Sequence, residues 1–400
     1  MIRVCVATGS RSEYHLLVPL LKRLAGNSQI DLRIAVTGSH LSSLYGDTCR
    51  FIEQDGFSID VKIPILQDKE GTPDDTNKAI ARALVGFSSY WSECPVDVVV
   101  LLGDRYELLA AAVAATNLRI PIAHIHGGET TEGAVDEAIR HSITKMAYLH
   151  FVSCEQYRKR VIQLGEDPRR VYNVGALGVE NIRTQGILDR RSFLESINAD
   201  FGDKFALATF HPVTLEDMSA REQIGEMLAA LDSFPEVPVL FTKSNSDAGG
   251  QEINEAIVEY VERRNDCVLV GSLGMQRYLS ALRHAEFLVG NSSSGILESP
   301  SFGVPTVNIG DRQKGRIQAA NILNCALQRE SIKGAISKAL SEDFRAPARS
   351  AINPYGDGHV SERIEETLVR FFMGDHIDTK KQFYDVCFDI EAVCSEEAYR

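Results

Sequence analysis

The 400-residue sequence has eight cysteines but no C-x-x-C pair, and only 13 prolines. Its cysteines are scattered, and several lie in apolar strand-like runs. This distribution is typical of reduced thiols in a cytosolic protein and argues against a disulfide framework or a zinc site. The low proline content, with 44% hydrophobic and 24% charged residues, excludes long disordered tracts. We therefore expect a cytoplasmic globular protein.

The sequence also lacks an excess of basic residues and any long hydrophobic run. Lys and Arg number 42 against 55 Asp and Glu, a net charge of −13. A phosphate backbone requires a basic face, so this balance argues against nucleic acid as a partner but permits a local cationic pocket for one nucleotide. No stretch approaches the roughly 20 apolar residues of a membrane span, and the opening MIRVCVATG is typical of a strand, not of a signal peptide. We expect no membrane partner.

The chain is too long for one ordinary core, which predicts two domains. Strand-like apolar runs alternate with amphipathic helical patterns in the first half, and the alternation restarts at Phe205. Such alternation predicts an α/β protein with two doubly wound, Rossmann-like domains and parallel sheets. We predict domains over residues 1–177 and 178–358, with a C-terminal helix and tail over residues 359–400 that pack back across the domains.

The stretch from Leu288 to Arg316 carries the strongest signal for ligand binding. A strand pattern runs into GNSSSG (290–295) and then into a predicted helix start, a pattern typical of anion binding because small residues let the backbone approach a ligand. Glu298, one turn later, is placed to accept hydrogen bonds from hydroxyls such as those of a ribose. The next strand is followed by three cations, Arg312, Lys314 and Arg316. Both loops should lie at one sheet edge and suit two phosphates, although either loop alone could be an ordinary solvated turn.

In the first half, the loop after the first strand lacks the G-x-G-x-x-G dinucleotide fingerprint. Arg11 is therefore its most informative residue, either facing a ligand or lying on the surface. The apolar run Val96 to Leu102 predicts a central strand buried on both faces, and Asp104 and Arg105 follow it. Ligands bind at this carboxyl edge in α/β sheets, although Asp104 could also cap the next helix.

A dense group of ionisable residues follows the strand pattern of residues 120–125. The group comprises His124, His126, Glu129, Asp136, Glu137, Arg140, His141 and Lys145. Helical spacing places Asp136 and Arg140 on neighbouring faces. We favour an active site over a structural cluster because two of the histidines emerge from an apolar run, and we assign no metal because neither H-x-x-x-H nor H-E-x-x-H occurs. In the second half, Pro212 ends a strand early and should leave His211 at the carboxyl edge, unless that histidine only caps or packs.

Together these motifs resemble the UDP-N-acetylglucosamine 2-epimerase family. They are TGSRSE (8–13), GDR (103–105), HIHGGE (124–129), RHSITK (140–145), FHP (210–212), GNSSSG (290–295) and GDRQKGR (310–316). The resemblance, which extends to about residue 320, implies a glycosyltransferase-B-like fold whose domains face a cleft, with UDP held mainly by the second domain. Ser12, where non-hydrolysing epimerases carry proline, favours the hydrolysing, sialic-acid-pathway branch. His126 stands where many hydrolysing relatives carry glutamate, which leaves the sugar open.

The resemblance implies anti elimination of UDP from UDP-N-acetylglucosamine to a 2-acetamidoglucal, then addition of water to give N-acetylmannosamine and UDP. This chemistry needs carboxylates for proton transfer and cations for the departing diphosphate. The candidate catalytic residues are Asp104, Glu129, Asp136 and His211. The candidate substrate-binding residues are Arg11, Arg105, His126, Arg140, Lys145, Asn291, Ser292, Ser293, Ser294, Gly295, Glu298, Arg312 and Arg316. By resemblance, Arg11, Arg316, Ser292 and Ser293 contact phosphates and Glu298 the ribose. No cofactor is expected.

Other functions stay open at this point. The same hydrolysis could act on UDP-N,N′-diacetylbacillosamine, a 2,4-diacetamido sugar nucleotide of the legionaminic acid pathway, or the protein could be a non-hydrolysing epimerase. A UDP-sugar glycosyltransferase would need an acceptor and would not explain the carboxylate-histidine group. A binding protein without catalysis would have no use for so many titratable groups. The resemblance also implies a homodimer or homotetramer, and the sequence specifies neither this state nor allosteric control.

Overall fold

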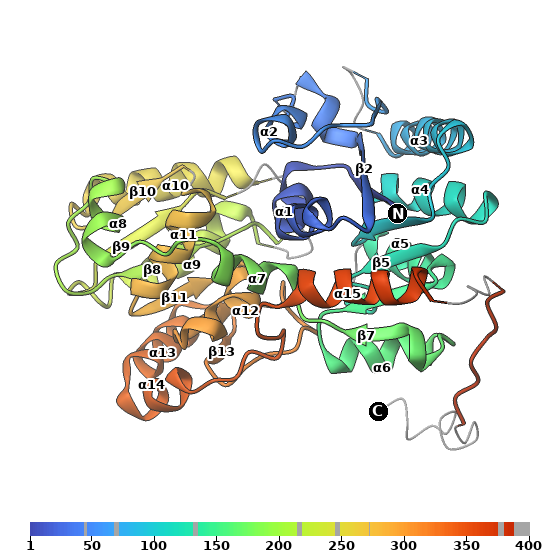
Figure 1. Cartoon of the computed structure of the whole chain (residues 1–400). Coiled ribbons are helices and arrows are strands. Elements are labelled where there is room, and N and C mark those ends of the chain that lie inside the picture. The colour runs from blue at the N-terminus through green and yellow to red at the C-terminus, as the bar shows by residue number, and fades with distance from the viewer. Residues whose placement is uncertain are drawn as a thin grey trace. The chain divides into compact units, whose positions relative to one another are not determined.

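Short, mostly β-branched apolar segments form two parallel sheets, one in each structural unit of the chain. The computed structural model describes residues 1–43, 46–67, 72–130, 135–213, 218–244, 249–271, 273–374 and 380–387. Unit 1 comprises Met1–Leu177 and His359–Arg400, and unit 2 comprises Gly178–Gly358 (Figure 1). The C-terminal helix thus belongs to unit 1.

The sheet of unit 1 has seven parallel strands in the order β3-β2-β1-β4-β5-β6-β7. Their bounds are β1 Ile2–Thr8, β2 Ile30–Thr37, β3 Val61–Ile63, β4 Val98–Leu102, β5 Ile122–Ile125, β6 Leu149–Val152 and β7 Val171–Asn173. Val4 pairs with Leu32 on one side and with Val98 on the other. The chain therefore winds outward from β1 in both directions, and the carboxyl ends of β1 and β4 form the topological switch point where ligands bind in such sheets.

Helices cover both faces of this sheet. They are α1 Arg11–Gly26, η1 Gly38–Leu41, α2 Cys49–Gln54, α3 Pro73–Glu93, α4 Tyr106–Asn117, α5 Val135–Met146, α6 Glu155–Gln163, η3 Pro168–Arg170 and α15 Val360–Phe372. The core on one face contains apolar residues of α1 and α15, and the core on the other contains those of α3, α4 and α5. Helix α15 packs against α1, where Arg23 and Asn27 contact the Glu365 carboxylate.

The sheet of unit 2 has six parallel strands in the order β10-β9-β8-β11-β12-β13. These strands are β8 Ala206–Thr209, β9 Val239–Thr242, β10 Val268–Val270, β11 Phe287–Gly290, β12 Thr306–Ile309 and β13 Ile322–Cys325. The helices are α7 Leu177–Thr184, α8 Arg190–Ser196, α9 Ala220–Leu231, α10 Gly250–Arg263, α11 Gly274–His284, α12 Ser294–Leu297, η4 Ser299–Phe302, α13 Arg329–Leu340 and α14 Glu342–Arg349. One core packs α9, α10 and α13 on the sheet, and the other packs α8 and α11.

The structure differs from the sequence expectations mainly at element ends. The central strand begins at Val98 instead of Val96 because Asp97 pairs with Arg3 at the start of the sheet. The helix expected after the GNSSSG loop is the single turn α12, followed by η4, so a long helix dipole does not act there. Helix α5 is described from Val135, and its expected start near Gly133 lies outside the described residues.

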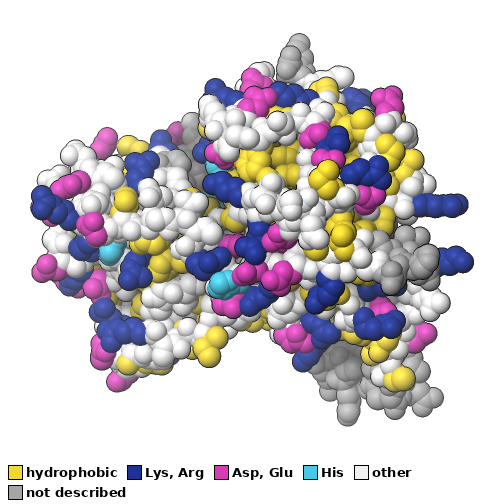
Figure 2. Space-filling view, in the orientation of Figure 1, with side chains coloured by type: hydrophobic (Ala, Val, Ile, Leu, Met, Phe, Trp, Pro, Cys, Tyr) yellow, Lys and Arg dark blue, Asp and Glu magenta, His cyan; other side chains and the backbone are white. Residues whose placement is uncertain are grey.

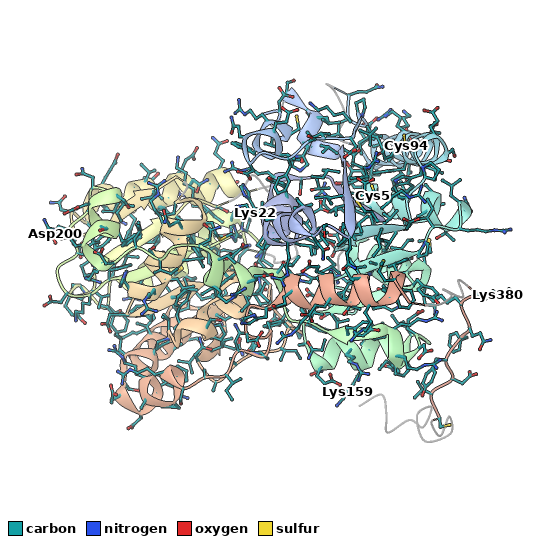
Figure 3. All side chains as sticks on the ribbon, viewed as in Figure 1. Cys5, Lys22, Cys94, Lys159, Asp200 and Lys380 are labelled. Atoms are coloured by element: carbon teal, nitrogen blue, oxygen red, sulfur yellow. The ribbon has the colours of Figure 1, made fainter. Side chains whose placement is uncertain are left out.

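Surface and thiol features bear on the class of protein. Acidic and basic side chains are intermixed over the face shown in Figure 2. No helix among the described residues has both the length and the apolar character needed to cross a membrane. The seven cysteines in the described ranges are free, and they include Cys5 inside the sheet and Cys94 at the surface (Figure 3).

Candidate active site

Asp104 and Arg140 form the centre of a partly buried charged cluster at the carboxyl edge of the unit 1 sheet. The Arg140 guanidinium, whose side chain is only 6% exposed, contacts the Asp104 carboxylate. It also donates to Glu137 Oε2 at 3.0 Å and to the backbone oxygen of Glu129 at 2.9 Å. A buried guanidinium requires this degree of pairing, and such charge-assisted contacts fix the orientation of their partners. Arg140 therefore positions the loops after β4 and β5.

Glu129 and His126 lie together in the loop after β5. Ser153, at the end of β6, donates its hydroxyl to Glu129 Oε1 at 2.7 Å. The Leu177 backbone N–H donates to His126 Nε2 at 3.3 Å, which leaves the proton of a neutral imidazole on Nδ1. Nδ1 lies 3.6 Å from Glu129 Oε1. The Glu129 carboxylate is therefore oriented from two sides.

The other histidine of this loop, His124, is structural. It is fully buried in β5 and donates from Nε2 to the Gly103 carbonyl oxygen at 2.8 Å. Burial lowers the pKa of His124 to about 3, so the ring is neutral at physiological pH. His124 holds the turn that carries Asp104 and is not expected to exchange protons.

The sequence-predicted residues of α5 separate along the helix. Asp136 is exposed on the first turn. Lys145, in the last turn, pairs with Glu166 Oε1 at 2.6 Å and donates to the Leu164 carbonyl oxygen. The structure thus groups Arg140 with Asp104 and Glu129 but places Lys145 at the opposite end of the helix. The reason is geometric, because α5 runs away from the carboxyl edge and five residues carry Lys145 more than one turn along it.

Arg11 and Arg105 follow the two strands that flank the switch point. Arg11 is exposed in the first turn of α1, donates from Nε to His15 Nε2 at 3.2 Å and lies 5.0 Å over the Phe51 ring. Arg105 donates from Nε to Glu107 Oε1 at 2.5 Å. Glu107 is fully buried in the first turn of α4 and was not identified from the sequence.

In unit 2, Asn291 joins the loops at the carboxyl edge. It accepts the His211 backbone N–H and donates to the His211 carbonyl oxygen, each at 2.8 Å. The Asn291 carbonyl oxygen accepts from Gln313 Nε2 at 2.9 Å and from Arg312 Nη1 at 3.2 Å. Gly290, the residue before Asn291, has a φ of +138°, and any side chain at this position would overlap the Thr209 carbonyl. Asn291 and Arg312, predicted to bind substrate, therefore also hold the loops together.

A group of buried polar atoms lies beside the GNSSSG loop. Tyr278 Oη, Ser294 Oγ and Glu298 Oε2 are buried and lie near one another, but none forms a hydrogen bond of ordinary geometry among the described residues. Burial raises the pKa of Glu298, while Ser294 and Arg316 lower it. Buried polar atoms without partners are rare in native proteins, so these oxygens are well suited to ligand hydroxyls.

The remaining predicted residues of unit 2 surround this group. Ser292 Oγ accepts the Ser294 N–H at 3.4 Å, and Ser293 immediately precedes α12. Gly295 packs so closely that a Cβ there would lie 2.9 Å from Thr306 Cγ2. Arg316 is half-buried at the end of the cationic loop. No group of three metal-ligating side chains occurs in the parts of the chain that the structure describes.

The fold defines a protein with two Rossmann-like domains of the glycosyltransferase-B-like class. Among solved structures, a putative UDP-N-acetylglucosamine 2-epimerase from Listeria monocytogenes matches with a TM-score of 0.79 and 18% identity, covering 96% of this chain and 99% of that one. The UDP-N-acetylglucosamine 2-epimerase of Neisseria meningitidis, solved with UDP-N-acetylglucosamine, matches with a TM-score of 0.78 and 16% identity, covering 92% and 100%. At these identities the likeness shows the fold.

Sequence comparison identifies the family. Residues 22–369 match the family model described as UDP-N-acetylglucosamine 2-epimerase, and the chain belongs to this family. It is 38% identical over 86% of its length to the GDP/UDP-N,N′-diacetylbacillosamine 2-epimerase (hydrolyzing) of Campylobacter jejuni, of which it covers 88%. It is 37% identical over 96% of its length to the polysialic acid biosynthesis protein P7 of Escherichia coli, of which it covers 98%. A hydrolysing diacetylbacillosamine 2-epimerase of Legionella pneumophila is 38% identical, over 92% of this chain and 96% of that protein. The resemblance read from the motifs is confirmed.

Proposed function

We propose that this protein is a hydrolysing 2-epimerase of a UDP-linked 2-acetamido sugar, which releases UDP and the C2-epimerised free sugar. The observation that supports it best is the contact of the partly exposed Asp104 carboxylate with the buried Arg140, with the oriented carboxylate of Glu129 at the same sheet edge. The names of the relatives from Campylobacter and Legionella, both hydrolysing 2-epimerases, point to the same reaction type. The proposed reaction needs no redox cofactor.

The proposed reaction has two balanced steps. A carboxylate removes the proton on C2 while the C1–oxygen bond to the diphosphate breaks, giving a C1=C2 double bond and UDP. Water then adds its oxygen to C1 and gives one proton to a carboxylate, while a protonated group delivers a proton to the opposite face of C2. Asp104, Glu129 and Asp136 are the proposed acid and base groups, with His211 on the leaving-group side. The contact with Arg140 fixes the position of the Asp104 carboxylate, as a catalytic base requires.

Unit 2 is the proposed UDP-binding part. The buried oxygens of Tyr278, Ser294 and Glu298 would accept or donate hydrogen bonds to the nucleoside, with Glu298 on the ribose hydroxyls. The cationic loop supplies Arg316 for the diphosphate, together with the small residues Ser292 and Ser293. A hydroxyl that pairs with the Glu298 carboxylate would remove the cost of leaving that oxygen buried without a partner.

UDP-N-acetylglucosamine is the substrate we propose first, with N-acetylmannosamine as the product for sialic acid synthesis. The E. coli relative, named as a polysialic acid biosynthesis protein, favours this choice. UDP-N,N′-diacetylbacillosamine is the second candidate, because the relatives from Campylobacter and Legionella carry that sugar in their names.

We also propose that the protein forms a homodimer or homotetramer. Sedimentation that shows a monomer at micromolar concentration would contradict this proposal.

The test is a direct comparison of both sugar nucleotides with the purified protein. UDP release and the free sugar are measured by chromatography, with each substrate at equal concentration. The proposal predicts UDP release with N-acetylmannosamine from UDP-N-acetylglucosamine, or with the diacetamido epimer from the second substrate. Interconversion of UDP-sugars without free UDP would identify a non-hydrolysing epimerase. Turnover that requires an acceptor would identify a glycosyltransferase.

A further inference from the structure

A buried carboxylate that the proposed mechanism does not use occupies the topological switch point of unit 1. Glu107 reaches from α4 to the ends of β1 and β2 and is 0% exposed. A Cβ at Gly9 would overlap its carboxylate, and a Cβ at Gly38 would lie 3.1 Å from Glu107 Oε1. The loops after β1 and β2 therefore carry glycine where they border this carboxylate, because a side chain at either position would lie too close to Glu107.

Two buried carboxyl groups, those of Glu107 and Glu13, lie near the guanidinium of Arg105. Its Oε1 accepts from Arg105 Nε at 2.5 Å, while its Oε2 has no partner among the described residues. Glu13, 5% exposed in the first turn of α1, is the second buried carboxyl group here, and it accepts the Gly9 N–H at 2.9 Å. Burial, with the nearby Glu107 as a smaller cause, raises the pKa of Glu13 to about 8. Arg105 lies near both carboxyl groups and is hydrogen-bonded to Glu107.

The Arg105 guanidinium uses only Nε for this contact. Its side chain is 42% exposed, and the described part of the chain offers no partner to Nη1 or Nη2. The guanidinium is planar, and a contact through Nε restrains its orientation while Nη1 and Nη2 stay available as donors to two oxygens of a phosphate. Arg105 directly follows Asp104, so it stands beside the proposed catalytic carboxylate.

We propose that Glu107 is the positioning residue for Arg105, and that Arg105 binds a phosphate oxygen of the nucleotide sugar. This inference rests on the proposed function in that it takes a UDP-sugar as the ligand. An acidic residue in the first turn of a helix also stabilises the helix dipole, so a purely structural role for Glu107 is the competing account. The two accounts differ in whether Glu107 acts through Arg105.

A double-mutant cycle on the full chain separates them. Equilibrium binding of UDP is measured by calorimetry for Glu107→Gln, Arg105→Gln and the double variant. We expect each single variant to weaken UDP binding at least fivefold, and the double variant to be no weaker than Arg105→Gln within twofold. Effects that multiply, or an unchanged affinity in Glu107→Gln, would overturn the proposal.

A control variant tests whether the loss of any paired arginine weakens UDP binding. A second variant is used if Glu107→Gln does not fold. Arg3, 43% exposed and paired with Asp97 at 2.6 Å, is the control, and Arg3→Gln should leave UDP affinity within twofold. If Glu107→Gln does not fold, Arg105→Lys keeps the charge but removes the Nε donor, and it should lose at least fivefold. Wild-type affinity in Arg105→Lys would reject the proposal.

The binding measurement is independent of turnover, so the two proposals can fail separately. The expected variant effects on UDP affinity in a chain that hydrolyses neither sugar nucleotide would support the role of Glu107 and reject the proposed reaction. Normal hydrolysis by the wild type, with UDP affinity unchanged in all variants, would reject the role of Glu107 alone.

Discussion

The side-chain amide of Asn291 is hydrogen-bonded to both the backbone N–H and the backbone carbonyl oxygen of His211, each at 2.8 Å. Asn291 follows β11, and His211 lies two residues after the end of β8. Gln313, from the loop after β12, in turn donates to the Asn291 carbonyl oxygen. Three loops at the carboxyl edge of unit 2 therefore form one hydrogen-bonded group around a side chain that is 0% exposed.

Asn291→Asp should remove one hydrogen bond of this group. The new carboxylate can still accept the His211 N–H, but it has no N–H to donate to the His211 carbonyl oxygen. The loss should lower the free energy of unfolding by about 1–3 kcal/mol and weaken UDP binding at least tenfold. Denaturant unfolding and calorimetry measure the two effects. The matched control is Asn308→Asp, which loses a donor to Asn324 in the same sheet. An equal loss of UDP affinity in both variants would show that the hydrogen bonds between Asn291 and His211 have no particular role in UDP binding.

Asp104→Asn should abolish most turnover while UDP still binds. The amide cannot accept a proton, and it exchanges the pairing with Arg140 for a weaker contact. We expect kcat to fall by about 10²–10⁴-fold, as for loss of an acid or base, with UDP affinity within threefold of the wild type. Asp97→Asn, which breaks the Arg3 pair at the start of the sheet, should leave kcat within twofold. Retention of a tenth or more of the wild-type kcat by Asp104→Asn would remove Asp104 from the catalytic group.

The stability of the protein should depend on the proton of Glu13. Burial raises its pKa from 4.5 to about 8, so the folded chain keeps a proton that the unfolded chain releases between these values. Unfolding therefore releases this proton, and its contribution to the free energy of unfolding declines as the pH rises from about 4.5 to 8. In Glu13→Gln the neutral amide removes this decline, so the variant should gain roughly 2–4 kcal/mol relative to the wild type between pH 5 and pH 9.

Denaturant unfolding at several pH values measures this difference. The exposed Glu53, paired with Lys62, provides the control substitution Glu53→Gln. That control should differ from the wild type by a nearly constant amount over the same range. A constant difference for Glu13→Gln as well would contradict a raised pKa at Glu13.

Lys381 ties the described C-terminal segment to the end of helix α5. Its ammonium donates to the carbonyl oxygens of Lys145 and Ala147 at 2.5 and 2.7 Å and pairs with Glu166 at 2.6 Å. Lys381→Met removes all three contacts and should lower the free energy of unfolding by about 1–3 kcal/mol. Lys159 is exposed on helix α6 (Figure 3), and the control Lys159→Met should cost less than about 0.5 kcal/mol. Equal effects would show that the segment is not anchored through Lys381.

The loops at the carboxyl edges could be predicted because their signals are local. An apolar run that ends in glycine and polar residues specifies a parallel strand and its exit turn, which placed Asp104, Glu129, His211 and Asn291 at strand ends. Contacts between loops are not local. Ser153 lies 24 residues from Glu129 in sequence, and no spacing rule joins them.

Two features of the site could not be read from the sequence for physical reasons. Glu107 was not identified, because its burial depends on glycines in two other loops. Lys145 was predicted with Arg140 as one of the ionisable residues on the same helix, and the structure places it away from the carboxyl edge, beside Glu166. In both cases the tertiary arrangement decides which ionisable groups meet.

Solvent deuterium labelling tests the central claim most directly. The protein is incubated in D2O with UDP-N-acetylglucosamine and, separately, with UDP-N,N′-diacetylbacillosamine, and the products are followed by proton NMR. Elimination and hydration predict free UDP together with a 2-epimerised sugar that carries deuterium at C2. Free UDP with a sugar that keeps its original proton and configuration at C2 would contradict the account, because it would show simple hydrolysis of the glycosidic bond.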